Sequence, residues 1–421
     1  MTESSRTIQP MIYLDYNATT PLDPTVLESI HNALQNAWGN PSSSHHFGSE
    51  ANGIIKRSRA SIAKMINAHN SEIIFTSGGT ESNNMVIHTA IEHYKKQRET
   101  TGRAILPPIP HIITSNQEHD SVCLPLKQLE AESKIELGVV HVSKSSGMVM
   151  PDAVMDAIRP NTCLVSLMLA NNETGIIQPI SEIFKSLQSI QKKRSEAGLP
   201  TILTHTDAAQ ALGKIPVDVL DLDVDYLTIV GHKFYGPRIG ALYVRSLGEP
   251  SGRPLYPMFF GGGQERNYRP GTENTGMIAG LGQAAQLVVD HLYEYQEHME
   301  NVRDYLEASL TEKFGKECIH INGRFSTSKR LPNTCNVSFI GDGLHGRTIL
   351  KTVNHLLASV GAACHSDRVA KPSHILLALG IPDKVAMNAV RMSVGRETSK
   401  QDIDVVVTDL KTAVESLQVQ N

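Results

Sequence analysis

The sequence predicts an α/β protein with a large domain built on a mostly parallel sheet and a smaller α+β domain. Three observations lead to this prediction. Between Ser71 and about Val244, short β-rich runs alternate with longer amphipathic stretches, as in strands joined by crossover helices. A long stretch with apolar residues at helical spacing follows near residues 281–315. The rest of the chain mixes strand-like and helix-like segments, as a separate α+β domain does.

Length and composition are those of an ordinary globular protein. At about 150 residues per domain, 421 residues suggest two to three domains. With 39 basic and 43 acidic residues the net charge is −4, which argues against a nucleic-acid or anionic-membrane partner. No apolar run approaches the ~18 residues of a membrane helix, and the start, MTESSRTIQP, lacks the features of a secretory signal. We therefore expect a cytosolic protein.

The elements of the large domain follow in order. The β-rich runs expected to form its sheet are EIIFTS, HIITS, LGVVHVS, CLVSLML, TILTHTD, YLTIVG and GALYV. The tract Lys95–Pro110 is charged and rich in proline, so we expect it to be a surface loop.

The second half of the chain is expected to form the connector and the small domain. The stretch at 281–315 is interpreted as one helix that joins the two domains. After it come strand-like NTCNVSFI, helix-like GRTILKTVNHLLASV and a terminal helix, QDIDVVVTDLKTAVESL. We assign residues 25–289 to the large domain, and 1–24 and 290–421 to the small one.

The cysteines do not form a pattern. There are five, an odd number, without a CxxC pair, which argues against a disulfide framework and a zinc site. Cys123, Cys163 and Cys335 lie in apolar runs and are expected to pack in the core. Cys364, in VGAACHSD, is followed by polar residues and is expected in an exposed loop.

Two features suggest an anion site and a carboxylate at the ends of strands. In EIIFTSGGTESNN, a strand leads through Gly78 and Gly79 into a helix that begins near Thr80, where backbone N–H groups can bind phosphate. Alternatively, these residues form only a tight turn with a capping residue. Asp207 follows a predicted strand, where ligands bind in α/β sheets, or else it caps a helix.

Lys233 is the third feature. It lies between two β-rich runs, next to His232 and the Gly236-Pro237 turn, where burial would lower its pKa and suit it to Schiff-base chemistry. The alternative is an ordinary solvated lysine. A phosphate site, a carboxylate and a lysine match the phosphate, ring nitrogen and aldehyde of pyridoxal 5′-phosphate.

An ordered set of motifs resembles a known family. The motifs are TSGGTESNN, EHDSV, ANNETG, HTDAAQ, GHKFYGP, GGGQER, RPGTEN and VGAACHSD. They resemble the pyridoxal-phosphate-dependent cysteine desulfurase and selenocysteine lyase family, in the class V aminotransferase branch. The likeness runs from Ile12 to Arg396 and implies fold type I of the pyridoxal-phosphate-dependent transferases.

The resemblance implies roles around the cofactor. Lys233 would carry it covalently, Asp207 would pair with the pyridinium, and His119 would stack on the ring, unless His119 is only a core histidine. The remaining implied cofactor contacts are Gly79, Thr80, Asn172, Gln210, His232 and, from a partner subunit, Thr272. A homodimer with shared sites is therefore implied. Many members have a hydroxyl residue where this chain has Val230.

The resemblance also implies the substrate side of the site. Arg391 would bind the substrate carboxylate, as a planar guanidinium can, although a surface ion pair is the alternative. Asn172 would contact the substrate as well, and Cys364 would be the catalytic cysteine. Its loop, VGAACHSD, differs from the SSGSAC-type loop of many desulfurases, which favours selenocysteine as substrate.

The implied reaction converts L-selenocysteine to L-alanine and elemental selenium or selenide, with a possible selenium acceptor protein. The first alternative is a cysteine desulfurase that acts on L-cysteine and supplies sulfur for iron–sulfur or thio-cofactor assembly. An aminotransferase of the same fold and a catalytically silent scaffold are further alternatives. We hypothesise that Asp120, next to His119, disfavours the Cys364 thiolate and thereby selects selenolate substrate, unless Asp120 only caps a helix.

Overall fold

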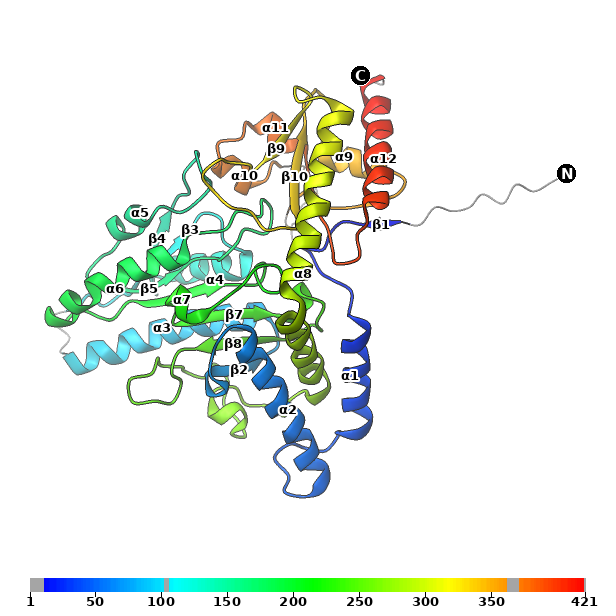
Figure 1. Cartoon of the computed structure of the whole chain (residues 1–421). Coiled ribbons are helices and arrows are strands. Elements are labelled where there is room, and N and C mark those ends of the chain that lie inside the picture. Colours follow the sequence, from blue (N-terminus) through cyan, green and yellow to red (C-terminus); the bar gives the residue numbers. More distant parts are fainter. Residues whose placement is uncertain (1–10, 102–105, 362–370, 420–421) are drawn as a thin grey trace. The chain divides into compact units, whose positions relative to one another are not determined.

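A computed structural model of the protein describes residues 11–101, 106–361 and 371–419 (Figure 1). The chain divides into two compact units. The larger unit comprises Thr20–Asn171 and Ile176–Tyr293, and the smaller one comprises Asn172–Gly175 together with the described parts of Met1–Thr19 and Glu294–Asn421. The expected boundaries at 24/25 and 289/290 lie within five residues of these. The segment Asn172–Gly175 was not expected in the smaller unit.

The larger unit is built on a seven-stranded sheet. Its strands, in spatial order, are β2 (Ile73–Thr76), β8 (Gly240–Val244), β7 (Tyr226–Val230), β6 (Leu203–Asp207), β5 (Thr162–Ser166), β3 (His111–Ser115) and β4 (Glu136–Val140). The pairs from β7 to β4 are parallel, whereas β8 is antiparallel to both of its neighbours. All strands except β4 are buried along their length, as expected for a sheet covered on both faces.

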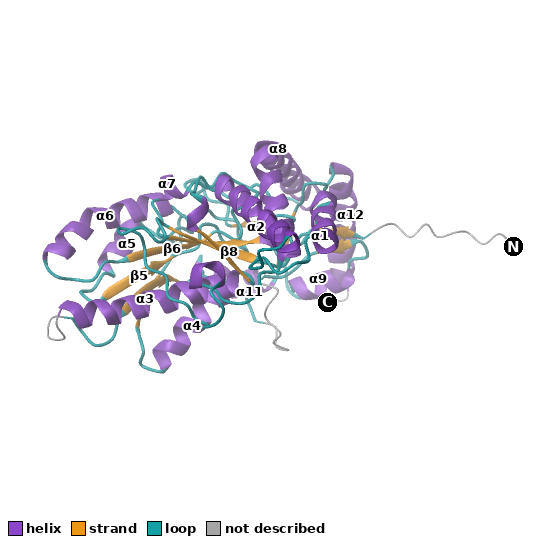
Figure 2. Ribbon diagram, turned by 90° about the horizontal axis from the view of Figure 1, so that it is seen from below, coloured by secondary structure: helices purple, strands orange, loops and turns teal. Residues whose placement is uncertain are grey.

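Helices cover both faces of this sheet. Figure 2 shows α3 (Gly79–Thr101) and α4 (Asp120–Ala131) on one face, and α6 (Ile180–Glu196) and α7 (Val219–Leu222) on the other. The core between the sheet and α3 and α4 contains Ile87, Ile91 and Leu126 beside strand residues such as Leu164. This unit also contains α1 (Pro24–Asn36), α2 (His46–Met65) and α5 (Pro151–Asp156).

The tract Lys95–Pro110 differs from the prediction. Its first part, up to Thr101, continues α3, so the expectation of a loop was wrong there. The charged residues lie on the solvated side of the helix, where Lys95 pairs with Glu92 at 2.7 Å. Arg98 donates from Nε to the carbonyl of Leu106 at 3.1 Å, which ties the end of the helix to the chain that returns to β3.

The smaller unit contains two sheets. In one, β10 (Thr334–Phe339) pairs antiparallel with β12 (Ala389–Ser393) and β9 (Ile319–Asn322); in the other, β1 (Ile12–Tyr13) and β11 (Leu356–Leu357) are parallel. The helix α8 (Thr275–Phe314) begins in the larger unit and ends in this one, as expected of the predicted connector. The terminal helix α12 (Lys400–Val419) and α8 contribute Ile403, Val406, Leu306 and Leu310 to the core. This unit also contains two short helices, α10 (His374–Ala378) and α11 (Asp383–Met387).

The helix predicted over GRTILKTVNHLLASV is shorter than expected. The observed helix α9 spans only Gly346–Thr352 and is followed by β11. The carboxylate of Asp409, on α12, accepts hydrogen bonds from the backbone N–H groups of Asn354, His355 and Leu356 at 2.7–3.3 Å. These N–H groups are therefore bonded to Asp409 rather than to helix carbonyls, which ends the helix.

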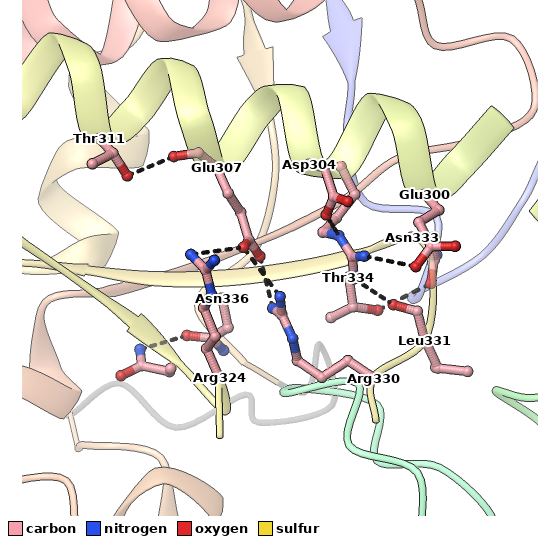
Figure 3. Close-up of polar contacts among 12 residues, drawn as sticks. Glu300, Asp304, Glu307, Thr311, Arg324, Arg330, Leu331, Asn333, Thr334 and Asn336 are labelled. Atoms are coloured by element: carbon pink, nitrogen blue, oxygen red, sulfur yellow. Dashed lines mark hydrogen bonds and ion pairs between the residues drawn. The ribbon is translucent and has the colours of Figure 1, made fainter. Parts of the chain in front are cut away.

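A buried ion-pair cluster fastens the segment before β10 to α8 (Figure 3). The carboxylate of Glu307 accepts from both terminal nitrogens of Arg330, at 2.7 and 3.1 Å, and its side chain is 4% exposed. Arg303 donates to the carbonyl of Leu331 at 3.1 Å. Paired charges of this kind position the chain, because separating them would leave a buried charge without its partner.

The cysteines are mostly where the sequence indicates. Cys163 and Cys335 are buried in the two cores, as predicted. Cys123 is only half-buried, and its thiol contacts the carbonyl of Glu118 at 3.4 Å, so the expectation of core packing holds for it in part. Cys318 is exposed, and Cys364 lies outside the described residues. No helix in the described part of the chain is long and apolar enough to cross a membrane.

Candidate active site

The carboxyl ends of the strands bring the predicted cofactor residues to one edge of the large sheet. Because β2 and β7 are both antiparallel to β8, β2 runs in the same direction as β7 and the other parallel strands. Asp207 ends β6, Lys233 follows β7, His119 follows β3 and Gly79 follows β2. Ligands of open α/β sheets bind at this edge.

The glycine turn at the start of α3 packs closely against β7. A Cβ atom at Gly79 would lie 2.7 Å from Cγ2 of Val230, so only glycine fits without displacing the neighbouring strand end. Val230, at the position where the resemblance implies a hydroxyl residue, thus faces the turn with a methyl group. Thr80 is exposed in the first turn of the helix. The N–H groups at a helix start are the donors that a phosphate requires.

The turn that carries Lys233 is rigidly held. Gly231–Lys233 form a 3₁₀ turn after β7, and the carbonyl of Gly231 accepts from the N–H groups of Phe234 and Gly236 at 3.1 and 3.0 Å. Tyr235 has a φ of +66°, an uncommon conformation for a residue with a side chain. Its N–H group donates to the hydroxyl of Thr20 at 2.8 Å, which supports the strained residue.

Two further predicted cofactor contacts are His232, in this turn, and Gln210, in the turn that follows β6. His232 is half-buried, and its burial, together with the neighbouring charge of Lys233, lowers the pKa of the imidazole to about 4. His232 is therefore neutral at pH 7 and can donate or accept a hydrogen bond. Gln210 is buried, and its side-chain oxygen accepts from Nζ of Lys214 at 3.2 Å.

Asp207 is a buried carboxylate that is held from two sides. Its Oδ1 accepts from the N–H of Ala209 and its Oδ2 from Nδ2 of Asn83, both at 2.9 Å. The side chain thus closes a turn after β6 and does not cap an α-helix. A carboxylate fixed in this way at a strand end suits a partner for a protonated ring nitrogen.

His119 is the N-cap residue of α4. Its Nδ1 accepts from the N–H of Ser121 at 3.1 Å and lies 2.8 Å from the hydroxyl of Ser121. Asp120 is the first residue of the helix and is half-buried. The N-cap position belongs to His119, and Asp120 is the acidic residue of the first turn, where a carboxylate favours the helix start.

The sequence did not indicate Glu118 as a functional residue. It is fully buried, and its Oε1 accepts from the hydroxyl of Ser115 at 2.6 Å and from the N–H of Met168 at 3.0 Å. Burial, with a contribution from nearby Asp207, raises the pKa of Glu118 to about 8. The residue before His119 is thus a neutral acid at pH 7. Its position in EHDSV, directly before the candidate histidine, was the available signal.

The smaller unit holds the predicted carboxylate-binding residue. Arg391 lies on β12, is 1% exposed, and donates from Nη2 to Oδ1 of Asp15 at 2.7 Å and from Nη1 to the carbonyl of Asn172 at 3.0 Å. Its backbone also bonds to Ser359 in both directions. Arg391 therefore forms a buried ion pair with Asp15, which the sequence did not reveal, and not the surface ion pair that was the alternative. Within the described chain, its Nε has no partner.

Two predicted residues, Thr272 and Cys364, remain. Thr272 is exposed in a loop of the larger unit, before α8. Cys364, the predicted catalytic cysteine, lies outside the described residues. Among the described residues, no group of three or more His, Cys, Asp or Glu side chains is arranged to hold a metal ion.

Comparisons with known proteins define the class. Residues 12–406 match the family model described as aminotransferase class-V, and the chain belongs to this family. A solved structure described as a NifS-like protein superposes with a TM-score of 0.81 at 32% identity, covering 96% of this chain and all of the other. The predicted fold type I and the resemblance drawn from the motifs are thereby confirmed, and so is the expected cofactor, pyridoxal 5′-phosphate.

Curated relatives narrow the comparison. Selenocysteine lyase of Rattus norvegicus is 55% identical over 413 residues, which are 97% of this chain and 95% of the relative. Mitochondrial cysteine desulfurase of Saccharomyces cerevisiae is 40% identical over 97% of this chain and 76% of the relative. The chain is thus more similar to the former than to the latter.

The residues at the sheet edge fit pyridoxal 5′-phosphate. The close approach of Gly79 to Val230 keeps the helix start free of a side chain, as a bound phosphate requires. Asp207 offers a fixed carboxylate, and Lys233 an amine on a rigid turn. We take these three as the groups that would hold the phosphate, the ring nitrogen and the aldehyde.

Proposed function

We propose that this enzyme is a selenocysteine lyase, which converts L-selenocysteine to L-alanine and elemental selenium or selenide. The observation that carries the proposal is the near full-length similarity to selenocysteine lyases, at 54–56% identity, against 36–40% for the cysteine desulfurases compared. The residues at the sheet edge fit the cofactor of that reaction. A cysteine desulfurase is the second candidate, because the family includes both activities.

Four residues of the chain have separate roles in the proposed reaction. Arg391 binds the substrate carboxylate, for which its Nε offers a donor, and Asn172 lies beside it as the acceptor of its Nη1 hydrogen bond. Lys233 would hold the cofactor at its aldehyde, and the amine of Lys233 would remove the α-proton of the substrate. Asp207 keeps a proton on the ring nitrogen. Pyridoxal phosphate, when bound, accepts the electrons that the α-carbon releases.

Cleavage of the Cβ–Se bond gives the products. Cys364 acts at the selenium, either as a nucleophile that takes it or as an acid that protonates it. Cβ receives a proton, so that alanine leaves with the atoms of the substrate minus selenium. The selenium leaves as the element, or as selenide when two thiols supply the two electrons and form a disulfide. A selenium acceptor protein is a further proposed partner.

We propose that selection of selenium involves Asp120. A selenol is ionised near neutral pH, whereas a cysteine thiol has a pKa of about 8.5. A carboxylate at the start of α4, next to His119, disfavours a second negative charge such as the Cys364 thiolate. The cysteine then serves an ionised selenolate better than a neutral thiol.

The assembly and compartment are also proposals. A homodimer is supported by the family resemblance, which implies that Thr272 in the motif RPGTEN reaches the cofactor of the other subunit. Thr272 is exposed. The cytosol is the compartment we propose, in line with the cysteine usage of the sequence, an odd number without a CxxC pair.

Alanine release tests the function directly. The pyridoxal-phosphate-loaded protein is assayed with L-selenocysteine and L-cysteine in parallel, together with Lys233→Ala and Cys364→Ala. We expect turnover of selenocysteine, negligible turnover of cysteine, and no activity in Lys233→Ala. Comparable turnover of both amino acids would instead establish the desulfurase. Activity of Cys364→Ala as a transaminase would favour the aminotransferase alternative.

The Asp120 hypothesis has its own test. Asp120→Lys should gain turnover of L-cysteine, with Asp120→Asn as the matched control that removes the charge but keeps the size. No gain in either variant would count against a role of Asp120 in selection.

A further inference from the structure

One buried amide connects the two groups that are expected to hold the cofactor ring. Asn83 lies on α3, is fully buried, and donates from Nδ2 to Oδ2 of Asp207 at 2.9 Å and to Oγ of Ser121 at 2.8 Å. Its Oδ1 accepts from the hydroxyl of Thr228 at 2.7 Å. Both amide protons and the amide oxygen are therefore engaged, each with a different element of the larger unit.

The neighbours fix the orientation of this amide. If the oxygen and nitrogen of Asn83 were exchanged, the oxygen would face the carboxylate of Asp207, and two acceptors would lie 2.9 Å apart without a proton between them. The observed orientation places donors against the carboxylate and the Ser121 oxygen. The hydrogen bond to Asp207 involves a charged acceptor and is thus one of the stronger kind.

On one side, the network determines the tautomer of a buried histidine. The hydroxyl of Thr228 gives its proton to Asn83 and must accept one from Nε2 of His205, 3.0 Å away. Nδ1 of His205 then accepts from the hydroxyl of Ser166 at 2.8 Å. Burial lowers the pKa of His205 to about 4, so the ring carries a single proton at neutral pH.

On the other side of Asn83, the hydrogen bonds determine which ring nitrogen of His119 accepts. The oxygen of Ser121 accepts a proton from Asn83, so the Ser121 hydroxyl donates to Nδ1 of His119 at 2.8 Å. The N–H of Ser121 donates to the same nitrogen at 3.1 Å. Nδ1 of His119 is thus an acceptor, and in the neutral ring the proton resides on Nε2. The network leaves Nε2 as the nitrogen that can act on a ligand.

We propose that Asn83 is a positioning residue of this enzyme, which fixes the Asp207 carboxylate directly and the tautomer of His119 through Ser121. The inference rests on the proposed function in one respect, namely that Asp207 and His119 face the cofactor ring. No other side chain of similar size supplies two donors and one acceptor at this place. Aspartate would put a second carboxylate against Asp207, and alanine would leave Asp207, Ser121 and Thr228 without this partner.

The test compares Asn83→Ala with a matched control, Asn161→Ala. Asn161 is also a buried amide in the larger unit, but it lies at the opposite end of the sheet, before β5, and donates to the carbonyl of Ile109 at 2.9 Å. The two readouts are the affinity of the cofactor-free protein for pyridoxal phosphate and the pH midpoint of the bound cofactor's absorbance. The melting temperature reports any general loss of stability.

We expect Asn83→Ala to lower the cofactor affinity by about 10- to 100-fold, the effect of losing a hydrogen bond to a charged group, and to shift the absorbance midpoint. Asn161→Ala should lower the melting temperature and leave both cofactor readouts unchanged. Equal cofactor affinities and equal midpoints in the two variants would overturn the proposal, since Asn83 would then be a structural amide only.

Two milder variants test the branches if Asn83→Ala does not fold. Ser121→Ala removes the connection to His119 and the acceptor of one Asn83 amide proton, but it leaves the hydrogen bond from Asn83 to Asp207. It should change the pH profile of kcat while the cofactor affinity stays within about twofold. Thr228→Val removes the donor to Asn83 Oδ1 and should shift the absorbance midpoint in the same direction as Asn83→Ala. Absence of both effects would overturn the inference. Wild-type protein that binds pyridoxal phosphate but releases no alanine would overturn the proposed function, and the cofactor titrations would still test Asn83.

Discussion

The two ends of the parallel strands in the larger unit both bury polar side chains, but the two ends use them differently. At the amino ends, Arg194 donates five hydrogen bonds, all to backbone carbonyls, and Asn161 donates to the carbonyl of Ile109. At the carboxyl ends, Asn83 donates to the side chains of Ser121 and Asp207. At the amino ends these side chains satisfy backbone carbonyls, whereas at the carboxyl ends Asn83 orients other side chains.

This difference separates side chains that stabilise the folded state from side chains that position the groups of the site. A side chain that satisfies backbone carbonyls contributes to the folded state, because buried acceptors without partners are costly. A side chain that fixes another side chain contributes to the geometry of a site, at some cost in stability. Substitutions at the amino ends should therefore change the free energy of unfolding, and those at the carboxyl ends should change cofactor and substrate behaviour.

The largest effect is expected at Arg194. Its guanidinium binds the carbonyls of Arg159, Pro160, Thr162 and Pro200, and the residue is 7% exposed. Arg194→Ala should lower the free energy of unfolding by about 3–5 kcal/mol, since it leaves several buried carbonyls without donors. Urea denaturation measures this loss.

The control is Arg194→Lys, which keeps the charge but has a single nitrogen and should lose a smaller amount. The absorbance of bound cofactor and the turnover of the folded protein should stay unchanged in both variants. A changed cofactor absorbance with unchanged stability would contradict the division between the two ends.

The second prediction concerns acid. His111, at the amino end of β3, and His205, on β6, are buried, and burial lowers the pKa of each to about 4. In the unfolded chain their pKa is about 6.5, so between pH 6.5 and 4 only the unfolded state takes up these protons. Stability is therefore lost as the pH falls through this window, by up to about 3 kcal/mol for each histidine.

Substitution of one histidine at a time makes this prediction specific to each end. His111→Asn keeps an acceptor for the hydroxyl of Thr162, 2.8 Å away in the wild type. It should reduce the loss of unfolding free energy between pH 6.5 and 4 without changing the cofactor absorbance. His205→Asn should also reduce this loss of unfolding free energy, but it should shift the absorbance midpoint, because His205 bonds to Thr228, which bonds to Asn83. Equal effects on the cofactor from both variants would refute the comparison.

The sequence predicted the sheet well because buried strands are local patterns. All seven β-rich runs form strands, and Asp207, Lys233, His119 and Gly79 lie at the expected strand ends. Asn83 could not be recognised, although it belongs to the motif TSGGTESNN, because its partner Asp207 is 124 residues away. The same holds for the end of α9, which depends on the distant carboxylate of Asp409. Contacts of this kind exist only after folding.

The third prediction uses Glu118 at the carboxyl end. Burial raises its pKa from 4.5 to about 8, so the folded state keeps a proton that the unfolded state releases above pH 4.5. Stability from this group is present below pH 4.5 and lost as the pH rises toward 8. Glu118→Gln cannot titrate and should gain about 2–3 kcal/mol relative to the wild type between pH 5 and pH 7. Chemical denaturation at the two pH values measures the gain.

Because Glu118 precedes His119, the same variant should also alter the pH profile of kcat. Glu118→Ala is the contrasting variant, since it leaves the hydroxyl of Ser115 and the N–H of Met168 without an acceptor and should be destabilising at both pH values. A constant stability difference between wild type and Glu118→Gln across this range would show that Glu118 is ionised in the folded protein.

The smallest effect is expected for an exposed pair at the same end as Arg194. Glu136 accepts from Arg159 at 2.8 Å, and their side chains are 42% and 51% exposed. Because water screens such a pair, Glu136→Gln should lower the free energy of unfolding by less than about 1 kcal/mol at low salt, and the difference should vanish near 1 M salt. Urea denaturation at the two salt concentrations measures it. A loss as large as that of Arg194→Ala would mean that location at the amino end, and not burial, determines the cost. A small, salt-dependent loss would mean that burial determines it, so that what separates the two ends is how each uses its buried donors.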